Sequence, residues 1–139
     1  MSAEPWDGLV SLASIVELHG EAISRYGGDG TPTPHDGCVE KSLGAAWNAE
    51  LYAGPDGGVP GLCFAGCLLY YLIKNHCFID GNKRVAWATS MEVLRGLGVT
   101  IDATDDAAEQ FCLDVISGTV GDAVDVAAWL ADRLVALPE

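Results

Sequence analysis

The apolar residues of this 139-residue chain recur mostly at the three- and four-residue spacing of an α-helix. One such run covers residues 11–26 and stops at two glycines, and a second reaches from Asp36, a predicted N-cap, to about residue 51. Residues 61–74 are apolar on nearly every side. We therefore expect this third helix to be the buried centre of the molecule.

The helical pattern continues through the second half of the chain. A fourth helix is expected over residues 81–97, with Asp80 as its N-cap. Asp106 and Glu109 resemble a capping box that opens a fifth helix reaching Ile116, and residues 122–134 give a sixth. Residues 99–102 form a short extended piece. The pattern predicts an all-α fold, a compact bundle of about six helices. We expect one domain over residues 1–139, with residues 1–8 as a flexible N-terminus.

Charge and hydropathy narrow the classes of partner. The net charge is −13, and nearly every charged residue after Gly96 is acidic, which argues against general binding to nucleic acid or anionic membranes. The N-terminus lacks the basic region and apolar core of a secretion signal, and the longest apolar run is too short for a membrane span. These features predict a soluble cytoplasmic protein.

The cysteines and the first histidine of the helical pattern are interpreted as structural. Five cysteines are an odd number without framework spacing, which predicts reduced thiols. Cys63 and Cys67 are interpreted as core residues, because their spacing fits no common zinc module. Cys77 follows His76 directly, and a histidine can activate a thiol nucleophile. Catalysis by Cys77 is nevertheless disfavoured, since the side chains of adjacent residues rarely face each other. His19 lies on the apolar face of the first predicted helix and is interpreted as a core or edge residue.

The stretch with candidate chemistry is residues 76–84, His-Cys-Phe-Ile-Asp-Gly-Asn-Lys-Arg. Gly81 and Asn82 stand where a helix should begin, and the first N–H groups of a helix attract anions. Asn82 also offers a side-chain donor. Arg84 adds a fork for phosphate oxygens, and Lys83 adds a point charge. This half of the motif is typical of a phosphate-binding site.

The other half of the motif offers a base and a metal ligand. Asp80 is a hard oxygen ligand suited to a magnesium ion that bridges to phosphates. His76 is suited to take a proton from a hydroxyl nucleophile, and Phe78 is expected to anchor the loop in the core. Each of these residues alone fits an ordinary helix start with surface charges. The set at this spacing favours phosphoryl or nucleotidyl transfer.

The nine residues closely resemble the signature of the Fic/Doc superfamily in its death-on-curing (Doc) toxin form, His-x-Phe-x-Asp-Gly-Asn-Lys-Arg, with Cys77 where proline is usual. Weaker likeness covers Asp36-Gly37-x-x-Glu40-x-x-Leu43 and the segment after Gly96. The resemblance implies a Fic-type helical bundle in which the motif loop leads into a central helix. It implies the following roles: His76 as catalytic base, Asp80 as magnesium ligand, Gly81 and Asn82 in the anion hole, and Arg84 on the phosphates of ATP.

Lys83 is the discriminating position of the motif. AMP-transferring Fic proteins usually carry glycine there, and a second arginine where this chain has Trp87. Both departures favour the Doc branch, in which a protein kinase toxin passes the γ-phosphate of ATP to a threonine of elongation factor Tu and stops translation. Such toxins are usually neutralised by an antitoxin whose disordered tail folds on binding. The loop over residues 51–60 matches in position the Fic flap, which lays a protein substrate against the site.

Two other functions stay open at this point. The same site suits transfer of AMP or another nucleotide to a protein, against which Lys83 and Trp87 argue. A catalytically idle Fic-type domain that serves as a binding module is the third hypothesis, against which the intact motif argues.

Overall fold

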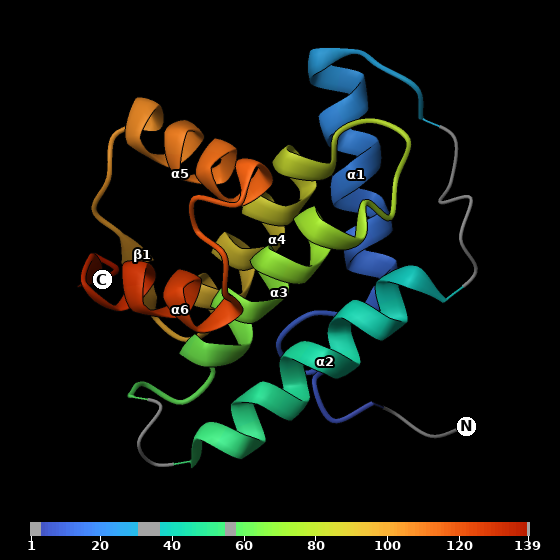
Figure 1. Ribbon diagram of the computed structural model, residues 1–139. Helices are drawn as coiled ribbons and strands as arrows, with labels where there is room; N and C mark the ends of the chain where they lie inside the picture. The colour runs from blue at the N-terminus through green and yellow to red at the C-terminus, as the bar shows by residue number, and fades with distance from the viewer. Residues whose placement is uncertain (1–3, 31–36, 55–57, 139) are drawn as a thin grey trace.

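The computed structural model describes residues 4–30, 37–54 and 58–138. The elements within these ranges follow in chain order as α1 (Leu12–Tyr26), α2 (Cys38–Ala53), α3 (Leu62–Asn75), α4 (Asn82–Gly96), β1 (Val99–Ile101), α5 (Asp105–Ser117), α6 (Ala123–Ala131) and β2 (Leu134–Ala136) (Figure 1). The predicted all-α bundle is confirmed, with one small sheet added to it.

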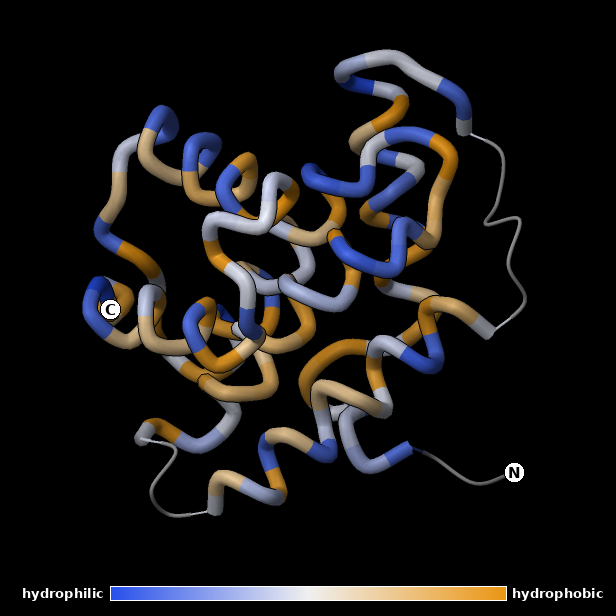
Figure 2. Tube along the Cα trace, in the orientation of Figure 1, coloured by the Kyte–Doolittle hydropathy of each residue, from blue (hydrophilic) through white to orange (hydrophobic). Residues whose placement is uncertain are grey.

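The centre of the molecule is α3, which packs against α2, α4, α5 and α6. Its side chains Phe64, Leu68 and Leu69 are fully buried, as the apolar run predicted. Figure 2 shows hydrophobic positions along the inner segments and hydrophilic positions mainly on the outer turns. The next helix, α4, packs on α3 and also on α1. The loop that joins α3 to α4 carries the motif, so the two best-packed helices hold it at both ends.

Gly66 of α3 lets α6 approach closely. A methyl group added to Gly66 would lie 2.6 Å from the Cα atom of Ala127. Because that neighbour is backbone, the helices would have to move apart. We expect Gly66→Ala to lower the free energy of unfolding by about 2 kcal/mol, since overpacking outweighs the gain in helix propensity.

Gly44 of α2 supplies the matched control for this substitution. An added methyl group there meets no atom of the described residues within 4 Å, so Gly44→Ala should be neutral or stabilising. Chemical denaturation of both variants measures the difference. Equal stability of Gly66→Ala and the wild type would contradict the close approach of α3 and α6.

Two predicted helix starts differ from the structure. The N-cap of α5 is Thr104, whose Oγ1 accepts from the N–H of Ala107, so the expected capping box of Asp106 and Glu109 is wrong. The expected N-cap of α4, Asp80, is also wrong. Gly81 occupies that position in the left-handed region, at φ 83°, and makes no side-chain cap. The carboxylate of Asp80 instead accepts from a backbone N–H beyond α1, a contact that no local pattern encodes.

The end of the sixth predicted helix is also corrected. The helix ends at Ala131, and residues 134–136 form β2, which pairs antiparallel with β1 in the register Val99↔Ala136 and Ile101↔Leu134. The backbone N–H and C=O groups of residues 134–136 therefore form hydrogen bonds with β1 instead of with the preceding turn of a helix. For the second helix, the predicted cap Asp36 lies outside the described residues.

The cysteine prediction is partly wrong. Cys38, at the start of α2, and Cys77, in the motif loop, form a disulfide between residues 39 apart in the sequence. Cys63, Cys67 and Cys112 are free and buried, as expected for core residues. Burial raises the pKa of the Cys67 thiol to about 12 and that of Cys112 to about 11, so both stay neutral.

None of the helices in the described part of the chain has the length and apolar content that a membrane span requires. At the N-terminus, Trp6 packs against the core. The flexibility expected for residues 1–8 and the single domain over residues 1–139 stay predictions.

Candidate functional site

The motif begins where α3 ends. His76 is the C-cap of α3 and adopts the left-handed conformation, with φ 50° and ψ 55°. This turn reverses the chain, so that the loop leads back into α4. A cavity of about 420 Å³ opens beside the loop, and it is lined by Ile73, Lys74, His76, Ile79, Asp80, Gly81, Asn82, Lys83, Arg84 and Ile116. All six site residues predicted from the sequence therefore border one cavity.

The buried side chain of Asn82 holds the motif loop through hydrogen bonds to the backbone of Phe78. Its Oδ1 accepts from the N–H of Phe78 at 2.9 Å, and its Nδ2 donates to the carbonyl oxygen of Phe78 at 2.6 Å. The same Nδ2 lies 3.3 Å from Nδ1 of His76. Asn82 is buried, and so is Phe78, which anchors the loop as predicted. The side chain of Asn82 thus orients the loop and the His76 ring, a use that the sequence interpretation, a donor for phosphate, did not anticipate.

The first turn of α4 faces the same cavity. The N-cap of this helix, Gly81, provides no side-chain cap, and the first N–H groups of a helix have no partner within it. Gly81, Asn82, Lys83 and Arg84 all line the cavity there. The partial positive charge of the helix end therefore lies beside two residues with cationic side chains, which suits an anion.

Lys83 is paired with an acid from α5. Its Nζ lies 2.7 Å from Oε1 of Glu109. The hydrogen bond from Lys83 and its charge lower the pKa of the Glu109 carboxyl. The pair is therefore intact at neutral pH. Because the folded-state pKa is lowered, any stability that the pair contributes is present above the unfolded-state pKa and is lost as the pH falls. The Lys83 ammonium is thus turned toward α5.

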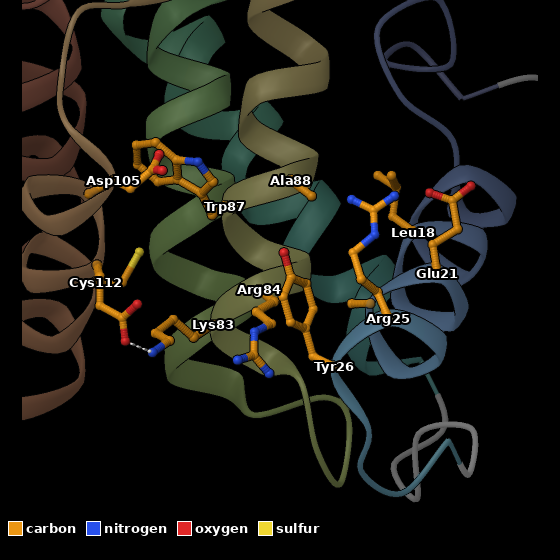
Figure 3. A pocket seen from close by; sticks show the side chains of 13 residues that line it. Leu18, Glu21, Arg25, Tyr26, Lys83, Arg84, Trp87, Ala88, Asp105 and Cys112 are labelled. Carbon is orange, nitrogen blue, oxygen red and sulfur yellow. Dashed lines mark hydrogen bonds and ion pairs between the residues drawn. The ribbon is translucent and has the colours of Figure 1, made fainter.

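Arg84 lies against α1 on the other side of α4. Its guanidinium stands 4.1 Å from the centre of the Tyr26 ring, a cation–π contact. Figure 3 shows these two side chains together, with the ion pair of Lys83 drawn as a dashed line. They border a second cavity of about 460 Å³ between α1, α4 and α5. Lys83 and Arg84 line both cavities and so stand at the boundary between them.

The sequence interpretation missed a set of contacts from α1 and the turn after it. His19 bonds the carbonyl oxygen of Asp80, and the N–H of Asp29 donates to the Asp80 carboxylate, each at 2.8 Å. The partners lie 61 and 51 residues apart in the sequence. No local pattern points to such contacts. The polar side chain of His19 on an apolar helix face was the one available signal.

The expectation that residues 51–60 act as a flap over the motif is wrong, because the described residues of this segment lie at the opposite end of α3 from the motif. Residues 51–53 still belong to α2, residues 55–57 lie outside the described part, and residues 58–61 lead into the start of α3. The motif follows the other end of α3, and an α-helix of this length spans about 20 Å. Gly61 accordingly lies beside Leu97, which follows the far end of α4. Among the described residues, the turn at Gly28 and Asp29 does adjoin the motif (Figure 1).

The donor set fits a magnesium ion that is shared with a nucleotide. Among the described residues, no three His, Cys, Asp or Glu side chains assemble into a metal cage. Mg²⁺ usually binds through one or two carboxylates together with substrate phosphates. Asp80 offers such a carboxylate on the exposed side of the loop, next to the anion site.

Comparison with known proteins supplies the family. Residues 9–94 match the Fic/DOC family, a stretch that covers more than half of the chain and includes the motif. The chain belongs to the Fic/DOC family. The family supports, in general terms, an enzyme that acts on a nucleotide substrate.

One curated relative is similar over a shorter stretch. A segment of 42 residues is 45% identical to Toxin Doc of Mycolicibacterium smegmatis. The segment covers 30% of this chain and 32% of that protein, so the match spans about a third of the relative's length.

Proposed function

We propose that this Fic/DOC protein is a Doc-like toxin that transfers the γ-phosphate of ATP to a hydroxyl group of a protein and blocks translation in the cytoplasm. The acceptor would be a protein like elongation factor Tu. The observation that carries the proposal is the gathering of His76, Asp80, the first turn of α4 and Arg84 around one cavity. The similarity to Toxin Doc supports the same branch of the family.

The residues would divide the reaction between them. His76 takes the proton of the attacking hydroxyl, a bond forms from that oxygen to the γ-phosphorus, and the bond to the β-phosphate oxygen breaks to release ADP. The first N–H groups of α4 and Arg84 hold the phosphates in place. Asp80 would hold Mg²⁺, which neutralises phosphate charge when bound. Asn82 keeps the loop and the His76 ring in position through Phe78.

Two positions favour phosphate transfer over nucleotide transfer. Lys83 fills the position where AMP-transferring members usually have glycine. Trp87 stands where they have a second arginine, and its ring packs on Trp129 at 6.3 Å between ring centres. An indole held in this way offers no charge to a phosphate. Transfer of AMP remains the second candidate, and an idle binding module the third.

A toxin of this kind would require an antitoxin. We expect a disordered tail that folds onto the toxin, and the cavity between α1, α4 and α5 is the groove that suits it (Figure 3). Its lining includes the apolar residues Leu18, Trp87 and Ala88, and Arg25 and Glu21 offer charges of both signs. A segment bound there would reach Lys83 and Arg84, which also line the motif cavity.

The deciding experiment uses ATP labelled at either the γ- or the α-phosphate. The purified protein is incubated with elongation factor Tu and Mg²⁺, and the label on the factor is measured. Label from the γ position alone supports the kinase. Label from the α position would move the protein to the AMP-transferring branch. Absence of both, together with absence of Mg-ATP binding, favours the idle module.

Glu109→Gln tests whether the ion pair to α5 competes with phosphate for Lys83. The substitution keeps the shape of the side chain and removes its charge. Exposed ion pairs are worth little, so we expect the KM for ATP to fall by about two- to fivefold. The control is Glu92→Gln, which breaks the pair with Arg95, a residue at the far end of α4. A KM that is unchanged in Glu109→Gln would show that phosphate does not compete for Lys83.

A further inference from the structure

His19 of α1 is a buried histidine that reaches the motif. It is 3% exposed, and its Nε2 lies 2.8 Å from the carbonyl oxygen of Asp80. Since a carbonyl oxygen can only accept, Nε2 carries the proton and donates it. The imidazole also stacks on the Phe78 ring, with ring centres 3.9 Å apart and an angle of 13° between the planes. His19 thus holds both a polar and an apolar group of the loop.

The turn after α1 holds the side chain of the same aspartate. The N–H of Asp29 donates to Oδ2 of Asp80 at 2.8 Å. A methyl group added to Gly28, which has φ 114°, would lie 3.2 Å from the Cβ of Asp80. Asp80 is therefore held at its carbonyl by His19 and at its carboxylate by the turn. Both contacts come from one helix and the residues that follow it.

The ring of His19 also supports the residue that precedes α4. An added methyl group at Gly81 would stand 3.5 Å from Cδ2 and 3.7 Å from Nε2 of His19. The imidazole thus stacks on Phe78, bonds to Asp80 and lies close to Gly81. A hydrocarbon side chain could fill the space, but it could not hold the carbonyl of Asp80.

We infer that His19 is a positioning residue, which fixes the main chain at Asp80 and so aims its carboxylate and the first turn of α4 into the cavity. This inference rests on the proposed function in one respect, the binding of magnesium and ATP at Asp80. His19 does not border that cavity, whose lining comes from residues 73–84 and Ile116. It therefore acts through the loop and would touch neither nucleotide nor metal.

Two substitutions separate its two contacts. His19→Phe keeps a ring for stacking on Phe78 and removes the donor to Asp80. His19→Gln removes the ring and keeps an amide donor close to the position of Nε2. Loss of a group that orients a metal ligand typically costs about 10- to 100-fold in metal affinity or activity. We expect the apparent KM for Mg²⁺ to rise by that factor in His19→Phe, and to stay within about threefold of the wild type in His19→Gln.

A control variant separates positioning from general loss of stability. Val126→Ala shortens a fully buried side chain of α6, on an element that takes no part in the motif. It should lower stability and leave the KM for Mg²⁺ unchanged. A rise in KM for Mg²⁺ that is equal in His19→Phe and Val126→Ala would overturn the inference, as would a wild-type value in a folded His19→Phe.

Hydrogen exchange of the protein alone tests the inference even if phosphate transfer fails. In His19→Phe, amides of residues 77–84 should exchange about five- to tenfold faster, because a contact that closes the loop is gone. The same amides should be unaffected in Val126→Ala. If the wild type transfers no phosphate while this local change is seen, the proposed function fails and the positioning role stands. Unchanged exchange in His19→Phe would refute the role.

A further test uses the wild-type protein alone, so it does not depend on whether a substituted protein folds. Nitrogen-15 NMR of the imidazole reports which ring nitrogen carries the proton. The bond to Asp80 requires the proton on Nε2 in the neutral ring. A neutral His19 that carries its proton on Nδ1 would contradict the inference, whatever the activity of the enzyme.

Discussion

Replacing His76 by alanine is expected to lower the rate of γ-phosphate transfer by about 10² to 10⁴-fold, the usual contribution of a general base. The side chain is exposed at the end of α3 and lines the motif cavity, so its loss leaves the core intact. Affinity for Mg-ATP should change little, because phosphate binding is assigned to Arg84 and the first turn of α4. The measurements are single-turnover transfer of labelled phosphate and ATP binding.

The backbone at His76 calls for a second variant. Alanine is strained in the left-handed conformation observed here, whereas asparagine adopts it more readily. His76→Asn therefore keeps the turn and still offers no base. Both variants should lose transfer rate to the same extent if His76 is the base. Activity that returns in His76→Asn would mean that the turn, and not proton transfer, is what the reaction requires.

Loss of the disulfide between Cys38 and Cys77 is expected to lower the free energy of unfolding by about 4 kcal/mol. The bond closes a loop between residues 39 apart, and in the chain-entropy description a loop of that length gives about this value. Cys38→Ser, Cys77→Ser and chemical reduction should each produce the effect. Denaturant unfolding with and without a reductant measures it.

The variants also control for one another. The free energy of unfolding of the double variant should match that of each single variant within a few tenths of a kcal/mol, since the same bond is lost in all three. Cys63→Ala removes a free buried thiol and should keep the response to reductant. A wild-type protein whose stability ignores reductant would contradict the disulfide.

The disulfide also bears on the motif. Cys77 follows His76 directly, and the bond ties this part of the loop to the start of α2. Near it, Nδ2 of Asn75 donates to Oγ of Ser42, and that hydroxyl donates to the carbonyl of Cys38. The loop is therefore attached to α2 on one side and to α1 on the other.

Most of the helices could be predicted because their signals are local. The apolar run of α3 predicted its burial, and the two glycines after residue 26 marked the end of α1. Errors fell at helix starts and at the C-terminal strand. Asp80 has the side chain of a good N-cap, yet its carboxylate bonds to Asp29, and residues 134–136 pair with a strand instead of extending a helix.

The sequence by itself determined the chemical groups of the site and their order in the motif. Nine consecutive residues suffice for this, because a loop that enters a helix brings its own residues to one place. The tertiary structure decided what holds them. Lys83 meets Glu109 across 26 residues, Asp29 and His19 meet Asp80 across 51 and 61 residues, and Cys38 meets Cys77 across 39. Contacts at such separations depend on how helices pack, which no local pattern of residues specifies.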